Sequence, residues 1–160
     1  QLQGNIMEVS IRHTGDKTFE AKGVGGSFVI KPAEVSPLEY FALGLISCSG
    51  VDIVSMAEKN GVELKSFSMS GDYVRNEDFP KKFNSAHFVY DIACDADETM
   101  VKRWVMASIE TYCSTMNTVR NCVDMSYSVL LNGATIADKV VIAKVGSEYL
   151  TEDIGGCCNG

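Results

Sequence analysis

The sequence predicts an α+β fold, in which two long central helices pack on antiparallel sheets in the order β-β-β-α-β-β-α-β. Three observations lead to this prediction: short segments in which apolar and polar residues alternate, a long apolar helix that begins at a capping box, and a second amphipathic helix between further strands. No internal repeat or linker divides the chain. We therefore expect a single domain over residues 1–132 and a C-terminal extension of unassigned structure over residues 133–160.

Three short strands are expected before the first helix. Met7, Val9 and Ile11 alternate with polar residues, which is the period of a half-buried strand. A turn then leads to a second strand at 18–22, and a glycine-rich turn leads to a third strand at 27–30.

The first helix is expected from residue 36 to about residue 60. Ser36 suits the N-cap, Pro37 suits the first helical position, and Glu39 at the third position completes a capping box. The middle of this helix, residues 41–54, is apolar almost all round. We therefore expect it to be buried on most sides.

Two long strands, a second helix and one further strand are expected after it. Apolar residues alternate over 66–73 and again over 86–94, with a charged loop between the two segments. Apolar residues at helical spacing then run from about 95 to 120, and a last alternating strand covers 123–131. His87 points away from the apolar side of its strand, so we expect it at the surface.

Composition and charge exclude several classes of function. Among 160 residues, 46% are hydrophobic and the net charge is -7, so the chain is expected to fold as a globular protein that repels nucleic acid and anionic membranes. The most apolar stretch, 40–54, is too short to span a bilayer and contains Asp52. Six cysteines without a secretory signal suggest a reducing, cytoplasmic setting.

Several familiar catalytic arrangements are not present in the sequence. Neither of the two histidines has a recognisable nucleophile beside it, which disfavours hydrolase chemistry. The glycines at 23–26 precede a predicted strand rather than a helix, so they form a turn and not a dinucleotide motif. There is no C-x-x-C pair, and the cysteines are too scattered for a zinc site. We expect no metal and no cofactor.

The cysteines are the most informative residues. Cys48 falls in the middle of the first predicted helix, and Cys113 falls in the second. A small buried hydrophobe is the commonest role of a free cysteine, and Cys94 and Cys122 are interpreted in that way. For Cys48 and Cys113, thiol chemistry is the alternative.

The sequence has SPLE at 36–39 with Cys48 nine residues later, CSGVDIVSM at 48–56, and YCS at 112–114. Together with the element order, these motifs resemble the OsmC/Ohr superfamily, the osmotically inducible and organic hydroperoxide resistance proteins. The resemblance covers residues 7–132. It implies an intertwined homodimer with active sites at the subunit interface.

The same resemblance implies a thiol peroxidase for organic hydroperoxides. Cys48 corresponds by position to the attacking cysteine and Cys113 to the resolving one. The sulfenic acid formed on the first condenses with the second, and a dithiol reductant, a lipoyl group in some members, reduces the disulfide.

The resemblance also implies a partner for the thiolate. Because burial raises the pKa of a thiol, a Cys48 thiolate needs a nearby cation or hydrogen-bond donor. The family uses an Arg from the N-terminal strands, which makes Arg12 the candidate. A solvated Arg12 on the polar strand face beside Glu8 and Ser10 is the alternative. Asp52 lies about 40° from Cys48 around the helix, where its carboxylate opposes thiolate formation unless a cation pairs with it.

Two function classes follow from these observations. One is a cysteine-based peroxidase, and the other is a non-catalytic dimer of the same fold with a binding or structural role. The family's helix-start Glu falls here on Leu38, and the acid comes one residue later at Glu39, which the capping box explains without a catalytic role. The adjacent Cys157 and Cys158 are expected to be inert, with a redox or metal-scavenging role as the alternatives.

Overall fold

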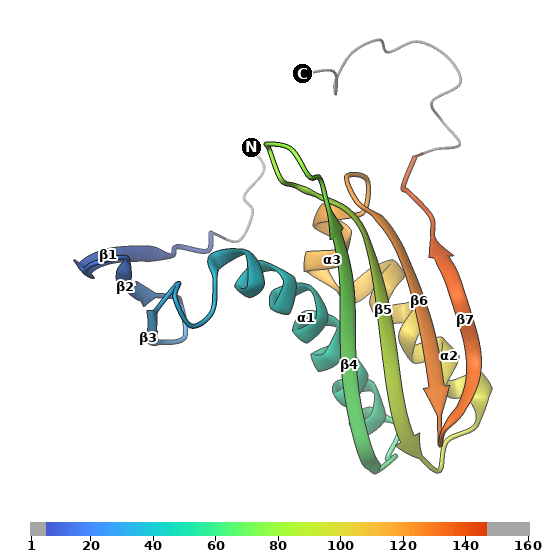
Figure 1. Cartoon of the computed structure of the whole chain (residues 1–160). Coiled ribbons are helices and arrows are strands. Elements are labelled where there is room, and N and C mark those ends of the chain that lie inside the picture. Colours follow the sequence, from blue (N-terminus) through green and yellow to red (C-terminus); the bar gives the residue numbers. More distant parts are fainter. Residues whose placement is uncertain (1–5, 147–160) are drawn as a thin grey trace, which may run out of the picture. The chain divides into compact units, whose positions relative to one another are not determined.

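The computed structural model describes residues 6–146, so Cys157 and Cys158 lie outside the described residues. The chain falls into two units that divide between Leu43 and Gly44. Helix α1 (Pro37–Lys59) begins in the first unit and continues in the second (Figure 1). The predicted order of strands and helices is confirmed, with one strand added at the end and the second helix divided.

The N-terminal unit contains an antiparallel sheet in the order β1 (Ser10–Gly15), β2 (Thr18–Lys22) and β3 (Ser27–Ile30). The bounds of β2 and β3 agree with the prediction, whereas β1 begins later than the alternating residues suggested. The reason is the hairpin turn, where Gly15 and Asp16 both have positive φ and Gly15 pairs with Thr18. This turn fixes the register, and the exposed Met7 and Val9 precede the paired segment.

The capping box at the start of α1 is confirmed. The Ser36 amide donates to Glu39 Oε2 at 2.7 Å, and the Glu39 amide donates to Ser36 Oγ at 3.2 Å. At the other end, Gly61 adopts a φ of 65° and the amide of Val62 donates to the carbonyl of Ala57 at 2.9 Å. The unpaired backbone groups at both ends of the helix thus find hydrogen-bond partners in residues next to those ends in the sequence.

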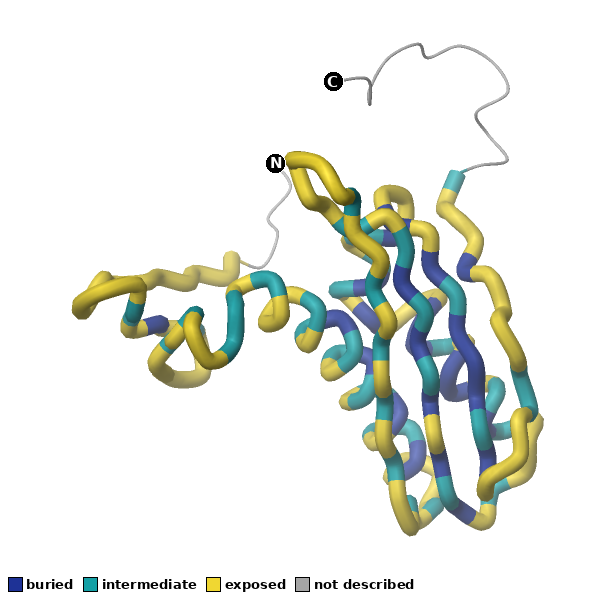
Figure 2. Tube along the Cα trace, viewed as in Figure 1, coloured by how far each residue is buried: buried dark blue, intermediate teal, exposed yellow. Residues whose placement is uncertain are grey.

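Only one face of α1 is buried within the chain (Figure 2). Its buried residues are Leu45, Ser49, Ile53 and Ala57. Val51 is 64% exposed and Val54 is 39% exposed. The expectation of burial on most sides is therefore not met in the single chain, because the sheet of the second unit covers one face of the helix.

Helix α1 alone among the described helices is long and apolar enough to cross a membrane, judged by length and composition. The same properties are found in the core helix of a soluble protein, so they are weak evidence for a membrane span. Asp52, on this helix, hydrogen-bonds to a buried serine rather than facing away from the protein.

The second unit is built on a sheet in the order β4 (Leu64–Arg75), β5 (Phe83–Cys94), β6 (Asp124–Leu131) and β7 (Ala134–Ile142). β5 and β6 are parallel, and the other neighbours are antiparallel. The helices cover one face of the sheet (Figure 1). Alternate residues of β5 point towards the helices, and all of them are buried: Ala86, Phe88, Tyr90, Ile92 and Cys94.

The segment predicted as one second helix is divided in the structure. α2 (Glu98–Ala107) begins at Asp97, whose side chain accepts a hydrogen bond from the Met100 amide at 2.8 Å. A π-helical turn, η1 (Ser108–Tyr112), follows, and Cys113 is extended with φ −74° and ψ 100°. Helix α3 (Ser114–Val119) then starts afresh. The prediction of one unbroken helix is wrong because the chain changes its hydrogen-bond period at Ser108 and leaves helical geometry at Cys113.

Candidate functional site

The structure brings the thiols of Cys48 and Cys113 into hydrogen-bond contact, although 65 residues separate them in sequence. Cys48 lies on α1 and is partly buried, and Cys113 lies between η1 and α3 and is fully buried. Both are free thiols in this structure. The two cysteines singled out by the sequence therefore form one site.

The surroundings of Cys48 favour its thiolate. Burial raises the pKa of the Cys48 thiol, but hydrogen bonds outweigh burial and leave the pKa below its ordinary value. These hydrogen bonds come from the backbone amide and the hydroxyl of Thr115, from the Cys113 thiol and from the backbone amide of Ser114. The donors near Cys48 are thus neutral groups of the chain itself.

The division of the second helix supplies two of these donors. Ser114 and Thr115 are the first residues of α3, and the first amides of a helix have no intrahelical acceptor. Because Cys113 is extended, the preceding π turn does not accept them either. In an unbroken helix both amides would be bonded to carbonyls one turn earlier, and neither could donate to Cys48.

The pKa of the Cys113 thiol is shifted in the opposite direction. Burial raises the pKa of the Cys113 thiol, and the negative charge of a Cys48 thiolate raises it further. The hydroxyl of Thr115, 3.4 Å from Cys113 Sγ, and the amide of Met116 act against this but do not reverse it. At neutral pH the arrangement is therefore a Cys48 sulfur that ionises more readily and a Cys113 thiol that stays protonated and donates to it.

Thr115→Val is expected to move the pH midpoint of Cys48 alkylation upward. The substitution removes one hydroxyl donor and keeps the shape of the side chain and the backbone amide. A hydrogen bond to a charged group contributes about 1.5 kcal/mol, which corresponds to roughly one pH unit. The measurement is the rate of iodoacetamide modification against pH, followed at the Cys48 peptide by mass spectrometry.

Thr118→Val is the matched control, because Thr118 lies on the same short helix and its hydroxyl donates to the Ser114 carbonyl at 2.7 Å. It should leave the Cys48 midpoint in place. If Thr115→Val and the parent have equal midpoints, the Thr115 hydroxyl does not stabilise the Cys48 thiolate.

Asp52 joins the site from one turn further along α1. It accepts a hydrogen bond from Ser108 Oγ at 2.9 Å. Asp52 also lines a cavity of about 560 Å³ between α1 and α2, where the apolar Met56, Met100 and Trp104 lie beside the charged Lys59, Asp97 and Arg103. Because Cys48, Asp52 and Met56 follow at intervals of four residues, this cavity lies along the same stripe of α1 as the Cys48 thiol.

Arg12 belongs to the N-terminal unit. Its guanidinium pairs with the carboxylate of Glu20 on the neighbouring strand, and both side chains are more than half exposed. Of the four residues expected at the site, the structure thus places Cys48, Cys113 and Asp52 in the second unit and Arg12 in the first. Glu39 lies in its capping box, and its hydrogen bonds with the Ser36 amide and hydroxyl lower the pKa of its carboxyl.

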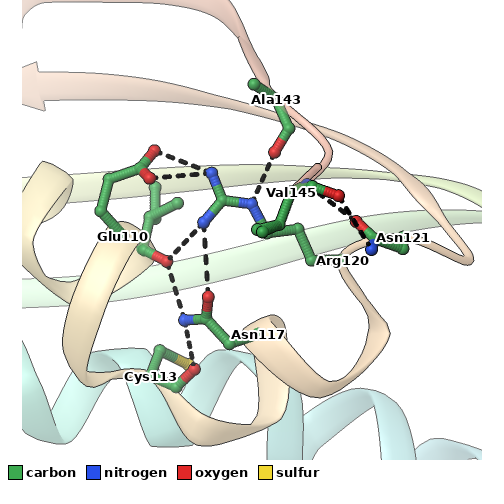
Figure 3. Close-up of polar contacts among 8 residues, drawn as sticks. Glu110, Cys113, Asn117, Arg120, Asn121, Ala143 and Val145 are labelled. Carbon is green, nitrogen blue, oxygen red and sulfur yellow. Dashed lines mark hydrogen bonds and ion pairs between the residues drawn. The ribbon is translucent and has the colours of Figure 1, made fainter. Parts of the chain in front are cut away.

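Arg120 braces the backbone at Cys113 (Figure 3). Its guanidinium is 5% exposed, meets both carboxylate oxygens of Glu110 at 3.0 and 2.8 Å, and donates to Asn117 Oδ1 at 3.3 Å. Asn117 in turn donates to the Cys113 carbonyl at 2.9 Å, and Arg120 Nε donates to the Ala143 carbonyl. The extended conformation of Cys113 is therefore fixed from η1, from α3 and from the segment after β7.

Sequence reasoning did not find Ser114 and Thr115 as site residues. A signal was present: residues 111–118 read TYCSTMNT, a run rich in polar and β-branched residues with low helix propensity. Such a run predicts a break rather than the middle of a long helix. Among residues 6–146, no group of three or more His, Cys, Asp or Glu side chains could hold a metal ion.

The model of one protein family, described as OsmC-like protein, matches residues 30–128. Among solved structures, a hypothetical protein from Aquifex aeolicus VF5 aligns with a TM-score of 0.74 and 24% identity, over 81% of this chain and 98% of that chain. An OsmC-like protein from Mycoplasma pneumoniae aligns with a TM-score of 0.67 and 14% identity, over 79% of this chain and 97% of that chain.

The organic hydroperoxide resistance protein OhrB of Bacillus subtilis aligns with a TM-score of 0.51 and 20% identity, over 79% of this chain and 98% of that chain. No curated protein matches the chain. At these identities the solved structures establish only the fold, and family membership rests on the match to the family model.

Proposed function

Because this chain belongs to the OsmC-like protein family, we propose that it is a thiol peroxidase that reduces organic hydroperoxides through Cys48 and Cys113. The observation that carries the proposal is the hydrogen-bonded pair itself, in which Cys48 has a lowered pKa and Cys113 a raised one. A thiolate is the nucleophile in this chemistry, and a second thiol within contact is what a sulfenic acid needs to form a disulfide.

The first step is the attack of the Cys48 thiolate on the distal oxygen of the hydroperoxide. An S–O bond forms and the O–O bond breaks. The electron pair leaves with the alkoxide, which takes up a proton and departs as the alcohol, and Cys48 is left as a sulfenic acid. The O–O bond has thus been reduced by two electrons from the Cys48 sulfur, one oxygen leaving in the alcohol and the other remaining in the sulfenic acid.

In the second step Cys113 loses its proton and its sulfur attacks the Cys48 sulfur. An S–S bond forms, the S–O bond breaks, and the hydroxide combines with a proton to leave as water. A dithiol of the lipoyl type then returns both thiols by exchange, becoming a disulfide itself. A reducing compartment such as the cytoplasm supplies that dithiol.

An organic rather than an inorganic peroxide suits the cavity beside Asp52. Its lining residues Met56, Met100 and Trp104 offer apolar contact to an alkyl or aryl group, and hydrogen peroxide has no such group to place there. The cavity follows the same stripe of α1 as Cys48.

The direct test is a thiol titration before and after addition of cumene hydroperoxide. A peroxidase loses two thiols per chain for each equivalent of peroxide consumed, and peptide mapping finds them as a Cys48–Cys113 disulfide. Unchanged thiols and unchanged peroxide would instead favour a non-catalytic dimer with a binding or structural role.

Two substitutions distinguish a catalytic role of Arg12 from one of Glu39. Arg12→Ala is expected to shift the pH midpoint of Cys48 alkylation upward, since the family resemblance implies an Arg of the N-terminal strands, from this chain or a second copy, as the cation that assists the thiolate. Glu39→Gln keeps a hydrogen-bonding group in the capping box and should leave peroxide turnover within a few-fold of the parent. The reverse pattern, with turnover lost in Glu39→Gln and an unchanged midpoint in Arg12→Ala, would give the helix-start acid the catalytic role.

We expect the protein to be a homodimer. Val51 and Val54 are exposed on the middle of α1 although the helix is one of the most apolar parts of the chain. A second copy would cover this face and remove it from water. Sedimentation velocity should find a dimer at micromolar concentration, and Val51→Lys should move the distribution towards monomer. A parent protein that sediments as a stable monomer would contradict the expectation.

A further inference from the structure

A chain of four hydrogen-bonding side chains runs through the core beside the two thiols, and the proposed chemistry makes no use of it. Tyr90 Oη of β5 lies 2.7 Å from Ser49 Oγ of α1. Ser49 Oγ lies 2.7 Å from Ser108 Oγ of η1, and Ser108 Oγ donates to Asp52 Oδ2 at 2.9 Å. Tyr90, Ser49 and Ser108 are all 0% exposed.

The carboxylate of Asp52 fixes the direction of the whole chain. An ionised carboxylate only accepts, so the single proton of the Ser108 hydroxyl is used there. Ser108 Oγ must then accept from Ser49, and Ser49 Oγ must accept from Tyr90. Tyr90 is therefore a donor, Ser49 and Ser108 are each both donor and acceptor, and removal of any one hydroxyl leaves a buried polar group without its partner.

The middle bond of this chain links the backbone of one cysteine to that of the other. Ser49 follows Cys48 directly on α1. The Ser108 carbonyl accepts the Cys113 amide at 2.7 Å, which is the hydrogen bond that closes the π turn. The Oγ–Oγ contact of Ser49 and Ser108 thus joins the residue beside Cys48 to the residue that holds Cys113.

We propose that Ser49 and Ser108 are positioning residues for the thiol pair, because their hydrogen bond holds the π turn against α1 and so keeps Cys113 within bonding distance of Cys48. Tyr90 and Asp52 form the two ends of this chain of hydrogen bonds. The proposal takes its biological meaning from the proposed peroxidase function, since fast disulfide closure protects a sulfenic acid from further oxidation. The physical quantity that this positioning sets is the effective concentration of one thiol towards the other.

A redox equilibrium measures that quantity without any hydroperoxide. The full chain is equilibrated in buffers with varying ratios of reduced to oxidised glutathione, and the fraction of Cys48–Cys113 disulfide is read by peptide mapping. Ser108→Ala is expected to lower the effective concentration of the pair by about tenfold or more, because the turn loses its link to α1. Tyr90→Phe keeps the volume of the ring and should shift the equilibrium in the same direction by about threefold.

Ser128→Ala is the matched control. Ser128 is also a buried serine, and its hydroxyl also joins several polar partners, among them Asp138 at 3.2 Å and the Lys139 amide at 2.9 Å. It lies on the sheet face opposite the helices, so a loss of stability without a loss of positioning is its expected result. Thermal unfolding of each variant separates the two effects. Should Ser108→Ala fail to fold, Tyr90→Phe decides the outcome.

Two results would overturn the positioning role: an effective concentration within twofold of the parent in both Ser108→Ala and Tyr90→Phe, or an equal decrease in Ser128→Ala. A parent protein that consumes no hydroperoxide but whose disulfide equilibrium responds to Ser108→Ala would overturn the proposed function and leave the positioning role intact. With peroxide present, Ser108→Ala is expected to close the disulfide about tenfold more slowly than the parent.

Discussion

Cys48→Ser is expected to lower hydroperoxide consumption at least about a thousandfold, because a serine hydroxyl does not ionise near neutral pH and is a far weaker nucleophile than a thiolate. The substitution is nearly isosteric, and the Cys48 position is only partly buried, so the fold should persist. The measurement is the loss of cumene hydroperoxide under excess dithiol reductant.

Cys122→Ser is the control for that experiment, since Cys122 is a free thiol exposed in the turn between α3 and β6. It removes one titratable thiol and should leave consumption unchanged. Full activity in Cys48→Ser, or equal losses in both variants, would contradict the assignment of Cys48 as the attacking thiol.

Local rules predicted those parts of the fold whose causes lie close together in sequence. The capping box of Ser36 and Glu39 needs only residues three apart, and the buried stripe of β5 needs only a period of two, so both were predicted from the chain alone. β7 was not predicted, although Asn132-Gly133 with φ of 51° and 83° is a favoured two-residue hairpin turn. The apolar run after it was too short to assign without the partner strand β6.

The break at Cys113 could not be obtained from apolar spacing. Val101, Val105, Ser108, Tyr112, Met116 and Val119 share a helical period that continues across the break. In the structure the π turn adds one residue to the helical turn, so that Tyr112 is 62% exposed and Cys113 is buried instead. The apolar spacing of the sequence counts Tyr112 as part of the buried stripe and so does not show the break. Side-chain contacts hold the break: Asn117 donates to the Cys113 carbonyl and accepts from the buried Arg120. Arg120 in turn donates to the Ala143 carbonyl after β7, which is a tertiary contact.

The candidate site was predicted in part for the same reason. The two cysteines came from a family resemblance to their sequence contexts, but the donors at Ser114 and Thr115 exist only because α3 starts there. Likewise, the burial of the Ser49 and Ser108 hydroxyls side by side depends on how α1 packs on η1. Neither serine has a distinctive context in the sequence.

Cys113→Ser is expected to form the Cys48 sulfenic acid once per chain and then to stop turning over. Without the resolving thiol, the sulfenic acid on Cys48 has no partner in contact, and further peroxide oxidises it to the sulfinic acid, which a dithiol does not reverse. A burst of about one equivalent for the sulfenic acid and about one more for the sulfinic acid should precede a steady rate at least about a hundredfold below that of the parent. Mass spectrometry of the Cys48 peptide should find added oxygen atoms instead of a disulfide.

Cys94→Ser makes the same change at another fully buried cysteine, on β5, and so reproduces the cost of placing a hydroxyl in the core. It is expected to lower the midpoint of thermal unfolding and to retain repeated turnover. Repeated turnover in Cys113→Ser at the parental rate would mean that the external dithiol attacks the Cys48 sulfenic acid directly. Cys113 would then serve only as the hydrogen-bond donor that lowers the pKa of Cys48, a role its serine replacement can keep because a hydroxyl also donates to a thiolate.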